Sequence, residues 1–193
     1  MMNLDNLMDK YYSEIESWKK HAQLVKDISQ EIINCFEQNN TNFVISNVDK
    51  VAVELSCAFH DVGRDEGKKD HEKRGKKIFK EEIWTDILET QLLSQFSDEE
   101  MKNIKYSVKQ AIVSHRDRDK VCSLDKNLIV GVCVYASDKI AHICQDRTYE
   151  TYWDVSIKFH KLFEEIRTLH KNTPEFDMLF FSIIQIMSNK YPH

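Results

Sequence analysis

Only four glycines and two prolines interrupt the 193 residues of this chain. Tight β-turns depend on these residues, so their scarcity moves the fold class to all-α. Apolar residues make up 41% of the chain, and in several segments they recur at three-to-four spacing, which is typical of amphipathic helices. We therefore expect one domain over residues 1–193, a helical bundle with its core at about 18–147 and further helices at 154–190 packed on that core.

The same periodicity predicts a succession of helices joined by polar loops. Ser97 followed by Glu100 marks one helix start, and Thr173 before Pro174 marks another. By propensity alone, 42–45 and 132–135 could also form strands, although no partner strand is evident. The expected helices cover 3–17, 18–38, a buried segment ending near 59, a segment opening at 71, 85–96, 97–115, 125–146 and two closing segments.

Charge and hydropathy argue against nucleic acid and membrane as partners. The formal net charge is −5, whereas affinity for phosphate backbones depends on an excess of Lys and Arg. Residues 1–20 lack an apolar signal core, and the apolar stretch 178–187 is too short to cross a bilayer. Five scattered cysteines without C-x-x-C spacing favour reduced thiols over disulfides. These features predict a cytoplasmic protein.

A histidine and an aspartate, His60 and Asp61, stand side by side at the end of a strongly apolar helix. A buried carboxylate is costly unless a positive charge neutralises it, and a metal ion would satisfy both side chains. Taken singly, an inward histidine is more often a hydrogen-bonded core residue than a metal ligand. However, four more isolated His or Asp residues fall on inward faces of other predicted helices: His21, His71, His115 and Asp138. No matching set of buried Lys or Arg is evident that could pair with the carboxylates.

Converging imidazoles and carboxylates from facing helices are how helical bundles build metal sites. Mixed nitrogen and oxygen ligands suit divalent Fe, Mn, Co, Ni or Zn, and the ligand types do not identify which of these metals binds. Six ligands are too many for one ion that keeps an open position. We therefore expect two divalent transition metal ions that share a carboxylate.

The order His, His-Asp, Asp, with Lys139-Ile140-Ala141 after the last aspartate, resembles the HD-domain superfamily of metal-dependent phosphohydrolases over about residues 21–147. Residues 60–64 and the spacing from His71 to Gly75 are similar to bacterial cyclic-dinucleotide phosphodiesterases and diadenosine-polyphosphate hydrolases, although Arg64 stands where the former usually carry lysine. The resemblance implies an HD-type bundle in which Asp61 bridges two metals, His71 and His115 complete the second, and the core ligands are His21, His60, Asp61 and Asp138.

Basic residues follow three of these positions closely, namely Arg64, Arg116 and Lys139. Positive charge placed beside metal ligands in an acidic protein suits a phosphate group, and Arg64 and Lys139 could offset charge that grows in the transition state. Asp65 is a candidate proton carrier. His142, one turn after Asp138, could touch the site or orient a ligand.

The expected function is hydrolysis of a phosphomonoester, phosphodiester or phosphoanhydride in a small phosphorylated molecule, with a nucleotide favoured, by attack of a metal-bound hydroxide. Two alternatives stay open: a di-iron oxygenase of the HD type, and a non-catalytic nucleotide-binding sensor that signals through its C-terminal helices. The apolar face of the last helix is either core or the seam of a homodimer. The sequence carries no glycine-rich phosphate loop, dinucleotide fingerprint or serine nucleophile elbow.

Overall fold

The computed structural model describes residues 3–13, 15–39, 43–65, 67, 69–124, 128–145, 152–169 and 173–190. Regular structure within these ranges is entirely helical, so the all-α prediction is confirmed and the strand alternatives are wrong for the residues described. The elements are α1 (Leu4–Tyr11), α2 (Glu16–Gln38), α3 (Asn47–Phe59), α4 (His71–Ile78), η1 (Phe79–Ile83, a π-helix), α5 (Trp84–Glu89), α6 (Asp98–Ser114), α7 (Arg118–Cys122), α8 (Leu128–Gln145), α9 (Tyr152–Thr168) and α10 (Pro174–Lys190).

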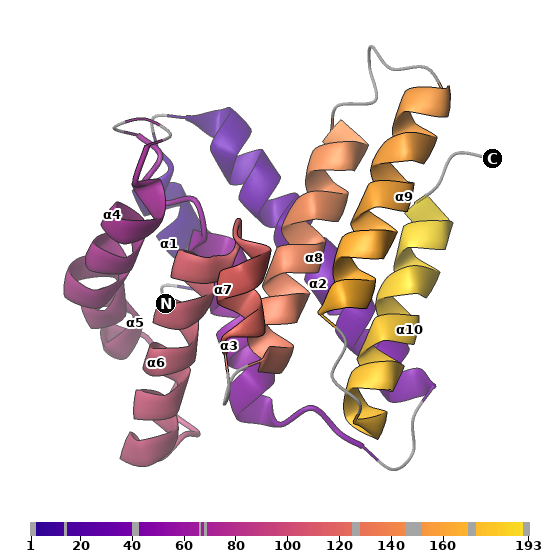
Figure 1. Cartoon of the computed structure of the whole chain (residues 1–193). Helices are drawn as coiled ribbons and strands as arrows, with labels where there is room; N and C mark the ends of the chain where they lie inside the picture. Colours follow the sequence, from indigo (N-terminus) through magenta and orange to yellow (C-terminus); the bar gives the residue numbers. More distant parts are fainter. Residues whose placement is uncertain are drawn as a thin grey trace.

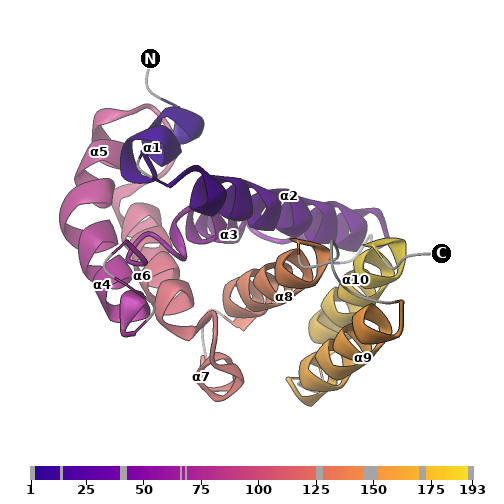
Figure 2. The same ribbon diagram turned by 90° about the horizontal axis from the view of Figure 1, so that it is seen from above.

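Three helices, α2, α3 and α8, contact one another and form the centre of the bundle (Figure 1). On one side, α6 packs on α3 and α8, and α4 packs on α6; on the other, α9 and α10 pack on α8, and α10 also packs on α2. Seen from above, α9 and α10 lie at one end of α2, and α1, α4 and α5 lie at the other (Figure 2). The helices α3 and α6 contact α8 between these two groups, and α3 also contacts α2.

Helix α8 is apolar over most of its surface because it contacts helices on both flanks of the bundle. Among the described residues it is the one helix whose length and composition would also suit a membrane span, and 67% of it is buried within the bundle. A core helix passes that test equally well. The expected helix limits at 125 and 146 lie outside the described residues.

Local capping signals place the helices that carry the central histidines. The side chain of Ser46 accepts a hydrogen bond from the Asp49 backbone N–H at the start of α3. Ser97 and Glu100 form a capping box at the start of α6, as the sequence predicts. Both helices end at a histidine, His60 after α3 and His115 after α6.

Two predicted helices differ from the observed ones. The expected helix 3–17 ends at Tyr11, and the next begins at Glu16, because the turn between them buries Tyr12. The expected helix 85–96 ends at Glu89. There the Thr90 hydroxyl donates to the Ile87 carbonyl at 2.6 Å and accepts from the Leu92 N–H at 3.1 Å, so a side chain takes over bonds that a continuing helix would need.

Gly63 allows the turn after Asp61 to lie directly against α4. A Cβ at this position would collide with the backbone of His71 and Gly75. Its φ is not positive, so close approach rather than a left-handed helix stop explains the glycine. This contact fixes the distance between the His60-Asp61 pair and His71.

Candidate metal centre

All six predicted metal ligands lie in one buried cluster, although they come from five segments of the chain. None is more than 5% exposed, and all four histidines direct Nε2 toward a carboxylate. Three groups of possible ligand atoms within 4.8 Å of one another are present: His21, His60 and Asp61; Asp61, His71 and His115; and His21, Asp138 and His142. Asp61 belongs to two of these groups, which is the arrangement that a shared carboxylate requires.

One half of the cluster surrounds a single oxygen of Asp61. Nε2 of His71 lies 3.1 Å from Oδ1 of Asp61, and Nε2 of His115 lies 3.5 Å from the same atom. The two imidazoles approach from α4 and from the end of α6, and their ring centroids are 5.5 Å apart. This half therefore offers two nitrogens and one oxygen to an ion.

The other half surrounds Oδ1 of Asp138 in α8. Nε2 of His21 lies 3.1 Å from this oxygen, Nε2 of His142 lies 3.3 Å from it, and Nε2 of His60 lies 3.6 Å from it. His142, expected only to touch the site or orient a ligand, thus lies in contact with Asp138. Its side chain is 44% exposed, so the cluster reaches solvent on this side.

Helix ends orient two of the histidines. Nδ1 of His60 lies 2.8 Å from the Cys57 carbonyl oxygen, and Nδ1 of His115 lies 2.7 Å from the Ile112 carbonyl oxygen. The last carbonyls of a helix lack partners within the helix, so a histidine three residues later can donate to one of them. A proton held on Nδ1 leaves Nε2 as the nitrogen that faces the cluster, as metal-ligating histidines require.

The other two histidines are held by side chains that the sequence analysis did not identify. Nδ1 of His21 lies 2.8 Å from Oε1 of Gln145, and Nδ1 of His71 lies 3.6 Å from Oε2 of Glu72. Gln145 lies two turns after Asp138 and one turn after His142 on α8. That shared helical face is the signal that could have identified it.

The Nε2 atom of His60 is the strongest sign that the cluster fits a metal. It is fully buried and makes no hydrogen bond within the described residues, yet it lies 3.6 Å from both Oδ2 of Asp61 and Oδ1 of Asp138. Buried nitrogens are normally paired, and a nitrogen aimed between two carboxylates suits a bound cation. The nitrogen and oxygen donors around it fit divalent transition metals.

Two cations approach the carboxylates from outside the cluster. Nη1 of Arg64 lies 2.5 Å from Oδ2 of Asp61, and Nζ of Lys139 lies 3.3 Å from Oδ2 of Asp138. The sequence placed Arg64 beside the ligands without a matching set of buried cations, and in the structure the Arg64 side chain is 15% exposed. Asp138 thus directs Oδ1 to imidazoles and Oδ2 to Lys139, whereas Oδ2 of Asp61 faces both Arg64 and His60.

Charge in the metal-free cluster is arranged around His60. Burial disfavours its protonated form, but Asp61 and Asp138 outweigh burial and raise the pKa of His60 to about 9. Burial also works against the charged aspartates, yet the surrounding histidines hold the pKa of Asp61 and of Asp138 well below the usual value. In contrast, burial lowers the pKa of His115. Without metal, an imidazolium at His60 lies between two carboxylates at neutral pH.

Metal-free protein is therefore expected to lose stability as the pH rises from about 7 to 9.5. His60 titrates near pH 6.5 when unfolded and near 9 when folded, so its contribution is complete below 6.5 and lost above 9. The loss should be roughly 3 kcal/mol, or about 6–12 °C in Tm for a chain of this length. His115 stays neutral over this range, and its destabilising effect is confined to pH below about 6.5.

Thermal melting of chelator-treated protein across this range measures the effect. His60→Gln should flatten the profile, because the titrating ring is gone. Metal-loaded protein should show the opposite sign, since deprotonated histidines bind metal more tightly. A metal-free Tm that stays constant from pH 7 to 9.5 would contradict the pairing of His60 with the two aspartates.

The remaining predicted site residues lie near the cluster but outside it. Arg116 is 45% exposed, and its Nη1 lies 3.9 Å from Oε1 of Glu72. Arg116 lines a cavity of about 570 Å³ beside the cluster, and the rest of the lining mixes cations and carboxylates: Glu72, Asp117, Arg118, Asp119, Lys120, Tyr135 and Glu165. Asp65 is exposed and lines a different cavity, of about 290 Å³, next to Tyr12 and Trp18.

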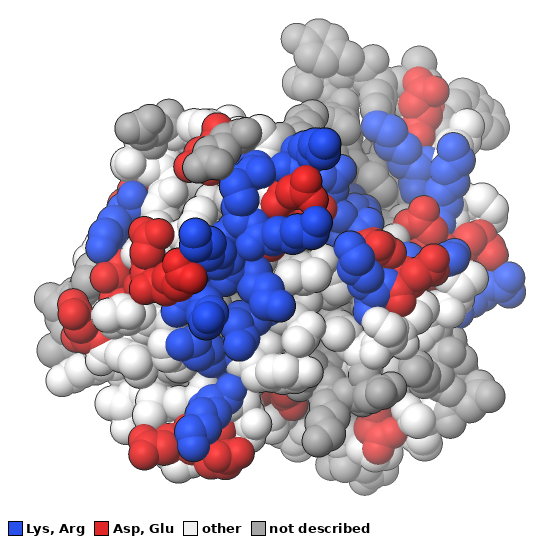
Figure 3. All heavy atoms as spheres, turned by 60° about the vertical axis from the view of Figure 1, so that its left-hand side comes forward, with Lys and Arg blue, Asp and Glu red and all other residues white. Residues whose placement is uncertain are grey.

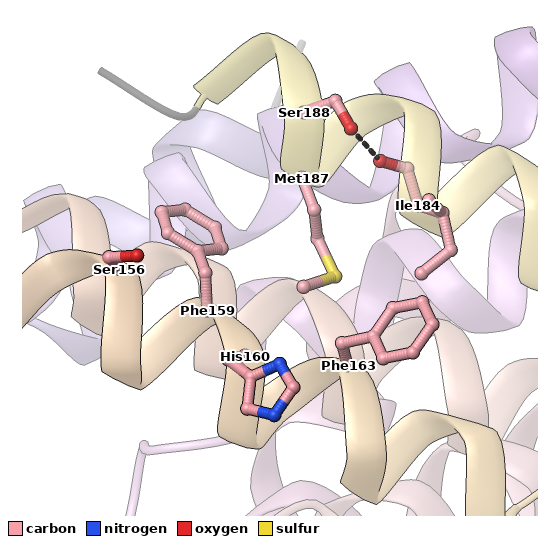
Figure 4. Close-up of a pocket in the computed structure, with 7 residues that line it drawn as sticks. All are labelled: Ser156, Phe159, His160, Phe163, Ile184, Met187 and Ser188. Atoms are coloured by element: carbon pink, nitrogen blue, oxygen red, sulfur yellow. Dashed lines mark hydrogen bonds between the residues drawn. The ribbon is translucent and has the colours of Figure 1, made fainter. Parts of the chain in front are cut away.

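An apolar groove between α9 and α10 is distinct from the metal cluster. Phe159, Phe163 and Met187 point into it, and His160 lies at its edge (Figure 4). His160 is its only titratable lining residue among those described, so the groove offers no ligand set for a metal. The proposed homodimer seam on the last helix stays a prediction.

No protein-family model, curated protein or solved structure matches this chain. The helical fold and the clustered histidines and aspartates consequently define it as an all-α protein with a candidate metal centre.

Proposed function

We propose that this chain is a metal-dependent phosphohydrolase of the HD type that acts on a small phosphorylated molecule, with a nucleotide favoured. The observation that carries the proposal is the pair of buried carboxylates whose inward oxygens are surrounded by imidazole Nε2 atoms. The order of these residues along the chain, His, His-Asp, His, His and Asp, is the order by which the sequence resembles HD phosphohydrolases.

Two metal ions would be held by the two halves of the cluster. His21, His60 and Asp138 would hold one, His71 and His115 would hold the other, and Asp61 would be shared. Bound there, such ions lower the pKa of water and polarise phosphoryl oxygens. The chain's part is to keep the imidazoles of His21, His60 and His115 oriented through Nδ1 and to bury the ligand side chains, while the cluster reaches solvent at His142.

Cations at the edge of the cluster favour a substrate that carries a phosphate group. Arg64 and Lys139 contact the ligand carboxylates, and Arg116 lies on the adjoining cavity. Figure 3 shows lysine and arginine side chains gathered in a broad band on the face of the molecule that includes the α4–α6 side, with acidic side chains among them. Such groups attract phosphate and can offset charge that develops on it during attack.

A phosphate-release screen over nucleotides and sugar phosphates tests the function. The protein should be purified gently, analysed for metals, and assayed with Mn, Fe, Co, Ni and Zn added separately. We expect metal-dependent release that chelation abolishes. Oxygen consumption by a mixed-valence di-iron form would support the oxygenase instead, and tight nucleotide binding without turnover in fully metallated protein would support the sensor.

Arg64→Ala is expected to lower kcat more than it raises KM. The planar guanidinium can hold Asp61 through one nitrogen and present others to a phosphoryl group. The combined loss in kcat/KM should be on the order of 2–4 kcal/mol, as for other donors that act mainly in the transition state. Arg64→Lys should recover part of it, because the charge is kept.

Metal content separates this role from a structural one. Arg64→Ala should retain its metals, and Arg167→Ala, an exposed α9 arginine paired with Glu164, should behave like the wild type. Parallel loss of metal and activity in Arg64→Ala would show that the arginine acts only by positioning Asp61.

A further inference from the structure

A third group of possible ligand atoms, from His21, Asp138 and His142, lies on the solvent side of the metal cluster. The Nε2 atoms of His21 and His142 lie 3.1 and 3.3 Å from Oδ1 of Asp138, and the three ligand atoms lie within 4.8 Å of one another. Neighbouring ligand atoms around a tetrahedral ion, with metal–ligand distances near those of zinc, are about 3.3–3.5 Å apart. The two nitrogen–oxygen distances are therefore close to those between ligands of one ion.

The helical geometry of α8 explains how His142 reaches the cluster. Asp138 and His142 are one turn apart, so both side chains lie on the same face of the helix. Gln145, a further turn on, also lies on this face, and its Oε1 is 2.8 Å from Nδ1 of His21. The ring centroids of His21 and His142 are 4.5 Å apart. One face of α8 thus brings both a carboxylate and an imidazole to the histidine that α2 contributes.

Hydrogen bonds alone do not account for the imidazoles around Oδ1 of Asp138. Nε2 of His60 lies 3.6 Å from the same oxygen, so three imidazole nitrogens converge on an atom that offers about two lone pairs. Nδ1 of His21 and Nδ1 of His60 each face a carbonyl oxygen, that of the Gln145 side chain and that of the Cys57 backbone. In a neutral ring, a proton donated there leaves a lone pair on Nε2. Nitrogen lone pairs that converge on a carboxylate oxygen are satisfied by a cation between them.

We propose that His142 is a protein ligand of the ion at Asp138. That ion then has three imidazole ligands, with His21 and His60 as the other two, whereas the ion at Asp61 has two. This inference rests on the proposed function for the presence of the metals. Imidazole ligands suit Zn²⁺ and Ni²⁺, and oxygen ligands suit Mn²⁺. The two positions therefore differ in metal preference, and the position at Asp138 is the one that favours Zn²⁺ more strongly over Mn²⁺.

Binding of Co²⁺ to the His71→Ala chain tests this role, because that variant should keep only the ion at Asp138. Adding His142→Ala should lower the Co²⁺ affinity at least about tenfold and change the visible Co²⁺ spectrum, which reports the ligands. Adding His142→Gln should have the same effects, since an amide can donate a hydrogen bond to Asp138 but is a poor metal ligand. Free imidazole should restore the original spectrum in the His142→Ala chain, because the vacated position is open to solvent.

The ratio of Zn²⁺ to Mn²⁺ affinity gives an independent readout. It should fall in both His142 variants, because losing an imidazole weakens Zn²⁺ binding more than Mn²⁺ binding. The control is His160→Ala, which removes an exposed α9 histidine outside the cluster and should leave the affinities and the spectrum unchanged. The same substitutions in the chain that keeps His71, loaded with two Co²⁺ ions, repeat the comparison should His71→Ala fail to fold.

A His142→Gln chain that binds Co²⁺ as tightly as its parent, with the same spectrum, would show that His142 only donates a hydrogen bond to Asp138 and would overturn the proposal. A His142→Ala spectrum that imidazole does not alter would overturn it as well. Either result in an active hydrolase would leave the proposed function in place. Co²⁺ binding that depends on His142, in a protein that releases no phosphate from any substrate, would retain the ligand and overturn the proposed function.

Discussion

Asp61→Asn and Asp138→Asn are each expected to reduce phosphate release at least about 1,000-fold, which corresponds to roughly 4 kcal/mol of transition-state stabilisation. Each replacement removes a negative charge from a buried oxygen that two or three imidazole nitrogens approach. An amide is a weak ligand for a divalent ion, so metal content should fall with activity. Phosphate release and elemental analysis on the same samples measure both effects.

The metal-free forms of these variants should also be less stable than the metal-free wild type. Without metal, both aspartates stabilise protonated His60, so each amide removes one of its two carboxylate partners, and Asp61→Asn also removes the carboxylate that pairs with Arg64. Breaking a buried pair in this way costs about 3–5 kcal/mol. Urea unfolding in the presence of chelator measures this cost.

Asp27→Asn is the matched control, because Asp27 is exposed on α2, the helix that carries His21. It should leave activity, metal content and stability unchanged. Near-normal turnover in either Asp61→Asn or Asp138→Asn would show that the reaction takes place elsewhere.

The second large effect is expected for metal stoichiometry. The wild type should contain close to two transition metal ions per chain, and His71→Ala and His115→Ala should each reduce this to about one. These histidines contact Asp61 but lie outside the group around Asp138, so the first ion should remain. At a metal concentration about 1,000 times Kd, binding of one ion stabilises the fold by about 4 kcal/mol, so full loading should raise Tm by at least about 8 °C.

His142→Ala is the informative comparison, because its ring is partly exposed and touches Asp138 without contacting Asp61 in the described structure. It should keep two ions at lower affinity. One ion in the wild type, unaffected by His71→Ala, would reduce the site to a mononuclear one. No metal under any loading condition would exclude the proposed chemistry.

Local chemistry was enough for the sequence to predict helix positions. The Ser97–Glu100 capping box begins its helix through bonds between neighbours, so the tertiary structure does not alter it. Helical spacing likewise placed His21 and Asp138 on inward faces, because a helix in a bundle buries its apolar stripe whatever its partners are.

The sequence did not predict where helices are interrupted, because the interruptions depend on side-chain hydrogen bonds and on burial. Thr90 ends its helix through its own hydroxyl, and the π-helix Phe79–Ile83 has no recognisable sequence signal. The turn at Tyr12 depends on burying that ring, and burial is a property of the assembled molecule.

The sequence by itself determined which side chains could bind a metal; the tertiary structure decided how they are grouped and charged. Gln145 supports His21 across 124 residues of chain, and Arg64 turns back three residues to pair with Asp61. Periodicity places Gln145 on the same face of α8 as Asp138 and His142, but it does not fix the partner that this face meets, and it does not place Arg64, which lies beyond the end of α3. The raised pKa of His60 has the same origin. It depends on the distance to two carboxylates, one of them 78 residues away, and that distance exists only once α3 and α8 have packed together.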